Sequence, residues 1–338
     1  MARASVLRAR AVEVQVEPLS VPTLDPFVIA SGRVHATRSV LVRVTLDGVE
    51  GLGEGSCLPP VTKEDQPDAL AALERHPNLD DLAEFPVARA ALEMAILDAR
   101  ARKAGQPLWR FLGGETAEAP KLETDITLPI LTPERMAELA AHWWAQGFRK
   151  FKVKAGHDLK ADLERLHAIK AAVPFAQFQP DANGGFTVDE ALRYLDTGLP
   201  FICFEQPCAT AAELRELARQ TSVPIIADES VKQVQDLDHL DAIGGVNLKI
   251  AKSGGMLAAR EIGLAAKRRG MKVMVGGMVE TKLGMTAAAH LAASLGGADF
   301  ADLDTAFLLT ENPFEGGYEA HGAVLQLPET PGLGITKR

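Results

Sequence analysis

The sequence predicts an α/β fold in which a parallel barrel of eight strands follows a smaller α+β unit. The first observation is a series of short apolar segments from Phe151 onward, spaced about 20 to 30 positions apart, each ending in a charged or polar residue. The second is that most stretches between these segments have helical patterns, and strand–helix alternation is typical of a parallel barrel. The third is an opening with the alternation and tight turn of antiparallel strands.

The opening residues predict strands first and helices second. Residues 9–18 alternate apolar and polar side chains, and Ser39–Leu46 reads as a second strand. Asp47-Gly48 predicts a tight turn into a third strand at residues 49–53. Alanines and leucines at three- and four-residue spacing predict helices over residues 67–75 and 87–103. We therefore expect residues 1–115 to form an α+β unit, completed by a tail over residues 312–338.

Residues 116–311 are expected to form the barrel. The strand candidates are residues 122–128, 150–154, 178–180, 201–205, 224–227, 245–250, 272–275 and 300–303. Residues 256–269 predict a helix, because basic residues occupy its last turn and Gly270 follows. A doubly wound open sheet is the competing architecture, but such a sheet is expected to carry a glycine-rich phosphate loop after an early strand. The glycine pairs at 113–114, 184–185 and 254–255 lack that spacing.

Composition and charge narrow the function classes. The formal net charge of −9 argues against nucleic acid or an anionic membrane surface as a partner. No uncharged stretch reaches the roughly 18 residues that a membrane span needs, and the N-terminus lacks the apolar run of a signal peptide. Cys57, Cys203 and Cys208 show no paired framework, which fits a reducing compartment. We therefore expect a cytoplasmic protein that acts on a small molecule.

Three carboxylates end three consecutive predicted strands: Asp181, Glu205 and Asp228. Because the carboxyl ends of barrel strands meet at one face, these side chains are expected to lie close together. Oxygen-only ligands favour a hard cation that keeps open positions, so Mg²⁺ is the expected metal. The alternative is that each carboxylate caps a helix N-terminus, which is common for any one alone.

Two lysines precede these carboxylates in the chain and a third follows them. Lys152 and Lys154 are two apart on a strand, so their side chains point the same way. Repulsion between the two ammonium groups is expected to lower the pKa of at least one, which suits a base; a solvated edge pair is the alternative. Lys252 lies past the sixth strand, across the barrel mouth from Lys154. Two opposed bases around a metal suit removal of a proton next to a carboxylate, through an enediolate, without a redox cofactor.

A further pair of carboxylates, Asp302 and Asp304, shares one face of the last predicted strand. Such a pair would bind a cation, most simply a substrate ammonium group. In the alternative, one of the two caps the loop and only the other faces inward.

Together these residues resemble the enolase superfamily, in its muconate-lactonising subgroup. The matching local motifs are Asp181-Ala182-Asn183, Glu205-Gln206-Pro207 and Asp228-Glu229-Ser230, and Asp302-Leu303-Asp304 resembles that of the dipeptide epimerases, typified by L-Ala-D/L-Glu epimerase. The resemblance implies a modified (β/α)7β TIM-type barrel with an α+β capping domain. It also implies a Mg²⁺-dependent isomerase that inverts the α-carbon of the C-terminal residue of a dipeptide. Barrels of this family often associate into homo-oligomers.

The resemblance also implies a role for each site residue. Lys154 and Lys252 would be the acid/base catalysts, Lys152 would touch the substrate carboxylate, and Asp302 and Asp304 would bind the dipeptide α-ammonium. The residues that would line the substrate are Thr127, Gly277 and Val279.

One position departs from the glutamate-specific members, which carry an arginine in the capping loop after Pro-Phe. Here that position is Gly32, with Arg33 next to it, and His35 and Arg38 are other candidates for polar contacts. Two other functions stay open. A muconate cycloisomerase or o-succinylbenzoate synthase would act on a substrate without the ammonium that Asp302 and Asp304 suit. A metal-binding pseudoenzyme would be expected to lack one of the lysines or carboxylates.

Overall fold

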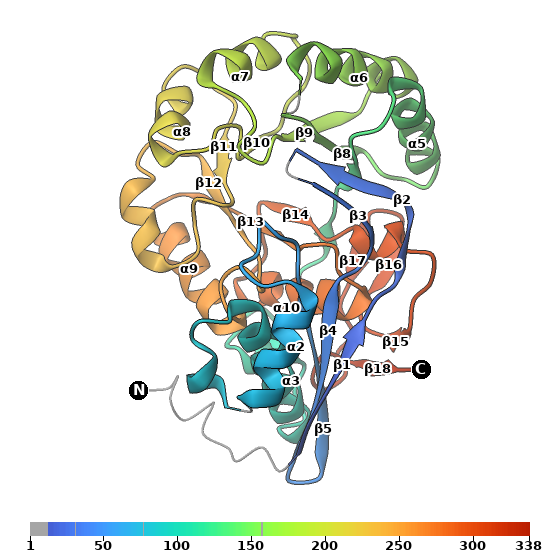
Figure 1. Ribbon diagram of the computed structural model, residues 1–338, viewed down its shortest axis with the longest axis vertical. Helices are drawn as coiled ribbons and strands as arrows, with labels where there is room; N and C mark the ends of the chain where they lie inside the picture. Colours follow the sequence, from blue (N-terminus) through green and yellow to red (C-terminus); the bar gives the residue numbers. More distant parts are fainter. Residues whose placement is uncertain (1–12, 31, 77, 157) are drawn as a thin grey trace.

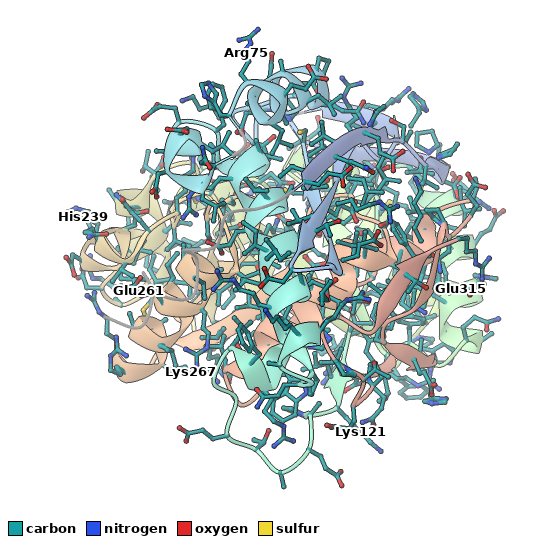
Figure 2. All side chains as sticks on the ribbon, turned by 90° about the horizontal axis from the view of Figure 1, so that it is seen from below. Arg75, Lys121, His239, Glu261, Lys267 and Glu315 are labelled. Atoms are coloured by element: carbon teal, nitrogen blue, oxygen red, sulfur yellow. The ribbon has the colours of Figure 1, made fainter. Side chains whose placement is uncertain are left out.

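The computed structural model describes residues 13–30, 32–76, 78–156 and 158–338. Figure 1 shows a ring of parallel strands surrounded by helices, and beside it a region of antiparallel strands with its own helices. Charged side chains such as Arg75 project from the surface (Figure 2). None of the helices in the described part of the chain combines the length and apolar character needed to cross a membrane.

An antiparallel sheet of β1 (Glu13–Leu19), β4 (Ser39–Leu46) and β5 (Val49–Ser56) opens the described chain. Asp47 and Gly48 both have positive φ, 50° and 79°, as the two-residue turn between β4 and β5 requires. The predicted strand over residues 9–18 is present from Glu13 onward, and its residues 9–12 lie outside the described residues. The helices of this region are α2 (Gln66–Arg75), the short 3-10 helix η1 (Leu79–Leu82), α3 (Pro86–Lys103) and α4 (Leu108–Phe111).

Helix α3 packs against β5 at very close range because β5 carries glycine on the contact face. A Cβ atom on Gly51 would lie 2.1 Å from the carbonyl oxygen of Ala95, and one on Gly53 would lie 2.0 Å from that of Ala91. Alanines on the helix face glycines on the strand, so the two backbones approach each other closely.

A hairpin of β2 (Pro22–Ile29) and β3 (Gly32–Ala36) extends from this region over the barrel (Figure 1). Both ends of β2 are bonded to the barrel. The amide of Thr310 donates to the carbonyl of Pro22 at 2.9 Å, and the amide of Ile130 donates to that of Val28 at 3.0 Å. The hairpin is therefore held in place over the strand ends.

The barrel is a sheet of eight parallel strands in the order β7 to β14. The strands are β7 (Ile126–Leu128), β8 (Lys150–Lys154), β9 (Gln177–Asp181), β10 (Phe204–Glu205), β11 (Ile225–Ala227), β12 (Gly245–Leu248), β13 (Lys272–Gly276) and β14 (Phe300–Asp302). The intervening helices are α5 (Pro133–Ala145), α6 (Leu159–Ala172), α7 (Val188–Leu195), α8 (Ala211–Ala218), α9 (Met256–Arg268) and α10 (Lys282–Ser294), with η2 (Val234–His239) in the place of a helix between β11 and β12.

The first and last barrel strands meet, which excludes the open doubly wound sheet. Thr124 forms a parallel bridge with Ala301, and the amide of Asp125 donates to the carbonyl of Ala301 at 3.0 Å. Seven β/α units followed by a final strand confirm the predicted modified (β/α)7β barrel with an α+β capping region.

Two predicted strands differ from the observed ones because of their partners. The strand predicted over residues 122–128 is split: β6 (Leu122–Glu123) pairs with the tail strand β17 (Val324–Gln326), whereas β7 pairs with β8. The strand predicted over residues 201–205 contracts to β10, because only its last two residues pair with β11, whereas Phe201 forms an isolated parallel bridge with Phe178 of β9.

The tail after η3 (Thr305–Leu308) forms three more short strands, β15 (Phe314–Gly316), β16 (Glu319–His321) and β18 (Ile335–Lys337). It contacts α3 through two hydrogen bonds. The amide of Leu333 donates to Asp98 at 2.7 Å, and the guanidinium of Arg102 donates to the carbonyl of Ile335 at 2.6 Å.

Candidate active site

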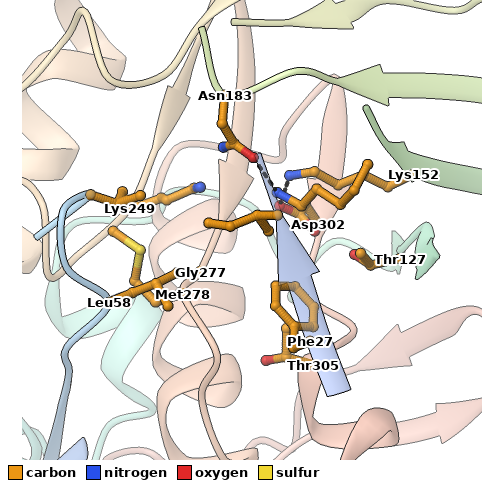
Figure 3. Close-up of a pocket in the computed structure, with 13 residues that line it drawn as sticks. Phe27, Leu58, Thr127, Lys152, Asn183, Lys249, Gly277, Met278, Asp302 and Thr305 are labelled. Atoms are coloured by element: carbon orange, nitrogen blue, oxygen red, sulfur yellow. Dashed lines mark hydrogen bonds and ion pairs between the residues drawn. The ribbon is translucent and has the colours of Figure 1, made fainter. Parts of the chain in front are cut away.

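A pocket lies at the carboxyl ends of the barrel strands, beneath the β2–β3 hairpin (Figure 3). Its polar lining is Thr127, Lys152, Lys154, Asn183, Lys249, Asp302 and Thr305, and its apolar lining is Phe27, Ile29, Leu58, Val61 and Met278, with Gly277 beside them. The two kinds of residue separate, because most of the polar groups come from barrel strand ends and most of the apolar ones come from the capping region. The pocket thus has a charged floor and an apolar roof.

Lys152 stands at the centre of the charged floor and is only 2% exposed. Its Nζ lies 2.7 Å from Asp302, 2.7 Å from Glu205 and 3.0 Å from Asp181. Burial acts to lower the pKa of Lys152, but the three carboxylates outweigh it and hold the pKa well above its usual value. The neighbouring ammonium of Lys154 was expected to lower the pKa of at least one of the two lysines. The pKa of Lys152 is raised instead, because attraction to the carboxylates exceeds repulsion between the ammonium groups.

Lys154 and Lys252 lie on opposite sides of the barrel, since β8 and β12 are four positions apart in the eight-strand order. Lys154 donates to Asp181 at 2.6 Å and to Asn183 at 3.4 Å. Lys252 donates to the carboxylate of Asp228 at 2.5 Å, to its carbonyl at 2.6 Å and to the carbonyl of Asn247 at 2.9 Å. Burial lowers the pKa of Lys252, although the Asp228 carboxylate opposes the shift. Both amines are thus fixed by their neighbours.

Asp181, Glu205 and Asp228 are fully buried at the ends of β9, β10 and just after β11. Ammonium groups bridge them: Lys152 joins Asp181 to Glu205, and Lys249 lies 2.6 Å from Asp228 and 3.7 Å from Glu205. Burial and the nearby Asp181 raise the pKa of Glu205 to about 7. For Asp228, burial acts to raise the pKa, but Lys249 and Lys252 hold it below its usual range.

These three carboxylates form an all-oxygen donor set that requires positive charge to be stable in a buried place. Hard cations with oxygen ligands, Mg²⁺ above all, meet that requirement. The donor chemistry of these three residues therefore fits a magnesium ion. In this structure, lysine ammonium groups lie between the three carboxylates, and among the described residues the acidic group whose oxygen atoms all lie within 4.8 Å of one another is a different one. Asn247 supports the set, because its amide donates to Glu205 at 2.7 Å.

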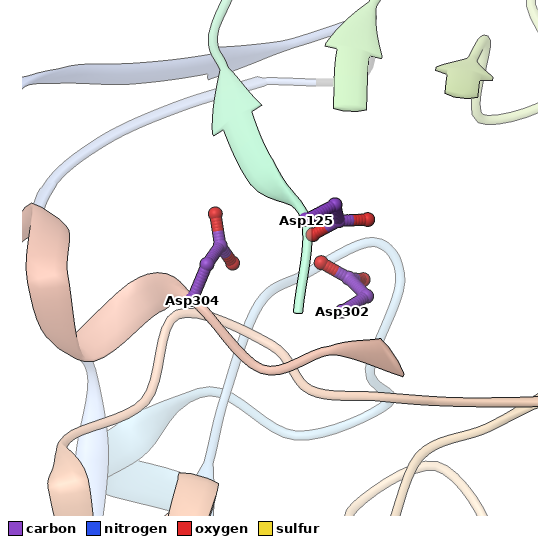
Figure 4. A group of neighbouring side chains, drawn as sticks. All are labelled: Asp125, Asp302 and Asp304. Atoms are coloured by element: carbon purple, nitrogen blue, oxygen red, sulfur yellow. The ribbon is translucent and has the colours of Figure 1, made fainter. Parts of the chain in front are cut away.

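A second acidic group lies where the barrel closes (Figure 4). Oxygen atoms of Asp125, Asp302 and Asp304 all lie within 4.8 Å of one another, and all three side chains are buried. Asp304 accepts a hydrogen bond from the amide of Thr127, and Asp125 accepts one from Gln179 at 2.7 Å. Burial, reinforced by Asp302, raises the pKa of Asp304 to about 7. One oxygen each of Asp125 and Asp304 has no hydrogen-bond partner among the described residues, so the group can receive a cation or an ammonium.

The loop after β13 approaches the pocket through its backbone. Gly277 lines the pocket, and a Cβ atom there would lie 2.2 Å from Cε of Met285. Val279 is buried, its carbonyl accepts a hydrogen bond from Ser56 at 3.0 Å, and its side chain is not part of the pocket lining.

The capping hairpin decides which of its side chains face the pocket. Phe27 pairs with Val34, Val28 with Arg33, and Ile29 with Gly32. Directly paired residues of antiparallel strands share a face, and Phe27 and Ile29 line the pocket. Gly32 therefore lies on the pocket-facing side and Arg33 on the opposite side.

Arg38 is engaged elsewhere, because its guanidinium donates to Asp65 at 2.7 and 2.6 Å. His35 is exposed on β3.

Several residues that the structure places in or beside the site carry no role in the sequence-based expectations, among them Asp125, Asn247 and Lys249. Lys249 lies near the end of the strand predicted over residues 245–250, which Lys252 follows. A lysine at a strand end is the sequence feature that could have identified it as a site residue. Asp125 lies within the strand predicted over residues 122–128, between the observed β6 and β7, and Asn247 lies within β12. A polar residue in a predicted strand suggests a solvent-facing position. Their roles appear only when the barrel closes around them.

Family models match most of the chain. Residues 11–85 match the N-terminal domain of the mandelate racemase / muconate lactonizing enzymes, and residues 135–338 match the enolase C-terminal domain-like family. The L-Ala-D/L-amino acid epimerase of Populus trichocarpa is 37% identical over 93% of this chain and 82% of its own length. The L-Ala-D/L-Glu epimerase of Bacillus subtilis is 35% identical over 96% of both chains.

Solved structures give the same result. The substrate-liganded complex of the Bacillus subtilis L-Ala-D/L-Glu epimerase superposes with a TM-score of 0.91 at 32% identity, over 97% of this chain and 99% of that one. The dipeptide epimerase of Enterococcus faecalis, complexed with Mg and the dipeptide L-Leu-L-Tyr, gives a TM-score of 0.88 at 32% identity, over 96% of this chain and 99% of that one. The fold, the strand-end lysines and carboxylates, and these matches together show that the chain belongs to the mandelate racemase / muconate lactonizing enzyme family of the enolase superfamily.

Proposed function

We propose that the protein is a Mg²⁺-dependent dipeptide epimerase, an isomerase that inverts the α-carbon of the C-terminal residue of a dipeptide. The observation that carries the proposal is the placement of two buried lysine amines, Lys154 and Lys252, on opposite sides of a barrel mouth with three carboxylates between them. The relatives named as dipeptide epimerases support the same reaction.

Asp181, Glu205 and Asp228 would hold the metal. When bound, Mg²⁺ supplies positive charge that stabilises the second negative charge of an enediolate as it develops on the substrate. Lys152 supplies a further fixed positive charge at the substrate carboxylate, since it is fully buried and its pKa is raised.

The proton moves between the substrate and the two opposed amines. In one direction, neutral Lys154 takes the α-proton and the electron pair of the broken C–H bond stays on the substrate. Lys252, as an ammonium, then donates a proton to the opposite face and forms the new C–H bond. In the other direction the two lysines exchange roles. No electrons are gained or lost overall, and the configuration at that carbon is inverted.

Asp302 and Asp304 would bind the α-ammonium of the N-terminal residue, with Asp125 adding negative charge behind them. The buried carboxylates with unpartnered oxygens support this role, since a bound ammonium would satisfy them. A cycloisomerisation substrate would leave these oxygens without a partner. Thr127, Gly277 and Val279 are proposed to line the substrate, the last through its backbone.

The C-terminal side chain of the dipeptide is proposed to be apolar. The roof of the pocket consists of Phe27, Ile29, Leu58, Val61 and Met278. Gly32 occupies the pocket-facing position of the hairpin, so no arginine there pairs with a substrate glutamate, and Arg33 belongs to the other face.

Three coarser properties are part of the same proposal. We place the division between the capping and catalytic domains near residue 115, with the tail from residue 312 belonging to the capping domain. We place the protein in the cytoplasm, which its three free, buried cysteines favour. We also propose that the protein forms a homo-oligomer, because barrels of this family often do so.

The test is proton exchange in D₂O with Mg²⁺ and a library of dipeptides. Deuterium at the α-carbon of the C-terminal residue, together with the appearance of its epimer, is the expected result. Lack of exchange with every dipeptide would remove the proposal.

A further inference from the structure

A second cavity adjoins the active-site pocket and has an almost wholly apolar lining. The apolar residues come from β2, the end of β7, α5 and η3: Leu24, Phe27, Pro129, Leu139, Trp143 and Leu308. Thr127 and Asp25 complete the lining. Phe27 and Thr127 also line the active-site pocket, so the two spaces share walls.

The charged residue of this lining is already paired. The guanidinium of Arg135 donates to the two carboxylate oxygens of Asp25 at 3.2 and 2.8 Å. The charge of Asp25 is thereby satisfied from helix α5, and the cavity offers an apolar guest no unpaired ionic group among its described lining residues.

The roof of the cavity is held in position on both sides. Hydrogen bonds join Pro22 to Thr310 at 2.9 Å and Val28 to Ile130 at 3.0 Å, and Leu24 and Phe27 lie between these two points. The hairpin register shifts between Pro22 and Phe27, which lets Leu24 and Phe27 face the same cavity. The cavity therefore exists without a ligand and is preorganised to receive one.

Leu24 is far more exposed than the apolar residues of the core. It is 60% exposed, and Phe175, at 86%, is the other large hydrophobic residue that is exposed in the described chain. A single exposed apolar residue is ordinary by itself. Leu24, however, stands at the mouth of an apolar cavity beside the active site, where a ligand would cover it.

We propose that this cavity, named here the Leu24 subsite, takes the side chain of the N-terminal residue of the dipeptide, and that the substrates carry an apolar residue at that position. The inference rests on the proposed function. The amide of Thr127, whose residue lines both spaces, donates to Asp304, and Leu308 closes the short helix that begins right after Asp304. The carbon that bears the α-ammonium also bears the side chain, so an ammonium held at Asp304 directs that side chain toward this cavity.

The experiment measures kcat/KM for deuterium exchange with two series of dipeptides. The first varies the N-terminal residue through Gly, Ala, Leu, Phe, Lys and Glu with a constant C-terminal residue, and the second varies the C-terminal residue. In the wild type, kcat/KM is expected to rise roughly tenfold or more from Gly to Leu in the first series, and to be lower for Lys and Glu than for Leu.

Leu24→Glu and Leu24→Lys introduce opposite charges into the subsite and should therefore change its preference in opposite directions. Leu24→Glu is expected to raise the ratio of N-terminal Lys to N-terminal Leu substrates roughly tenfold, and Leu24→Lys to do the same for N-terminal Glu. Both variants should leave preferences in the second series unchanged. Phe175→Glu and Phe175→Lys are matched controls, because Phe175 is exposed and lines neither cavity; they should leave all ratios within about twofold of the wild type.

The outcomes are separable. Exchange that is indifferent to the N-terminal residue, or Leu24 variants that change all substrates equally, would overturn the Leu24 subsite while the epimerase stands. Variants that change the C-terminal preference instead would assign the cavity to the other side chain and likewise overturn the proposal. Absence of exchange with every dipeptide would remove the proposed function and the subsite with it.

Discussion

The ammonium of Lys154 lies 2.6 Å from the carboxylate of Asp181, so a proposed proton carrier is paired with a proposed metal ligand on the neighbouring strand. The same relationship recurs on the far side of the barrel, where Lys252 lies 2.5 Å from Asp228. Each lysine is fixed by a carboxylate that belongs to the metal set. Metal binding and proton transfer are therefore expected to depend on one another.

Removal of the metal is expected to abolish proton exchange, because the enediolate would lose its stabilising charge. Treatment with EDTA should stop deuterium incorporation, and added Mg²⁺ should restore it. Asp228→Asn should weaken Mg²⁺ binding at least about tenfold by calorimetric titration. Asp238→Asn is the matched control, since Asp238 is an exposed partner of Arg269; equal Mg²⁺ affinity in the two variants would show that Asp228 is not a ligand.

Substrates without a free α-ammonium are expected to react poorly. N-acetylation of the dipeptide removes the charge that Asp302 and Asp304 are proposed to bind, and should cost about 2–5 kcal/mol in kcat/KM. Asp304→Asn keeps an acceptor for the Thr127 amide but loses the negative charge, so it should lower kcat/KM for free dipeptides and affect acetylated ones far less. A uniform loss for both substrates would contradict ammonium binding at this position.

Glu54 is expected to be a major stabilising residue, because it joins the capping sheet to helix α10. Its buried carboxylate accepts from the hydroxyl of Ser39 at 2.7 Å and from the amides of Thr281 and Gly284 at 3.0 and 2.9 Å. Glu54→Ala leaves these donors without a partner and should lower the free energy of unfolding by about 2–4 kcal/mol. In urea denaturation, Glu50→Ala on the same strand should change it by less than about 0.5 kcal/mol, because Glu50 is exposed.

The protein is expected to lose stability in acid partly through His290. Burial lowers the pKa of His290 to about 3 from an ordinary value of 6.5. Between these values the unfolded chain binds a proton that the folded chain does not. The contribution is therefore complete above pH 6.5 and is lost toward pH 3, at about 1.4 kcal/mol per pH unit.

His290→Asn tests this pH dependence, because its side-chain oxygen can replace Nδ1 as acceptor for the Trp109 amide, which lies 3.0 Å away. Free energies of unfolding measured between pH 6.5 and 4.5 should vary less steeply with pH in this variant. The difference in slope should correspond to about one proton fewer bound on unfolding. Identical slopes in the two proteins would show that His290 does not titrate on unfolding.

Much of the barrel could be predicted because its strands are short, apolar and end in polar residues. Lys150–Lys154 was predicted with the observed bounds, since Val153 and Phe151 alternate with lysines whose spacing is unambiguous. Helix α3 was also predicted almost entirely, because its alanines and leucines recur at three- and four-residue spacing. In such segments the local pattern and the tertiary environment agree.

The remaining features depend on contacts between distant residues. Glu54 lies in a glycine-rich strand and reads as solvent-facing, but Thr281, which is 227 positions away, covers it. Asp125 becomes part of an acidic group only when β14 returns beside it. The pKa of Lys152 was expected to respond to Lys154, two residues further along the strand, whereas the opposing effects of burial and of the carboxylates of Asp302, Glu205 and Asp181 determine it.

The most direct test of the two-base assignment follows each epimer separately in D₂O with Lys154→Met and Lys252→Met. With one lysine left, a proton can leave and return only on one face of the α-carbon. Each variant should therefore exchange one epimer of the dipeptide without inverting it, and the two variants should exchange opposite epimers. Epimerisation at the wild-type rate in either variant, or exchange of the same epimer by both, would contradict the placement of Lys154 and Lys252 on opposite faces of the substrate.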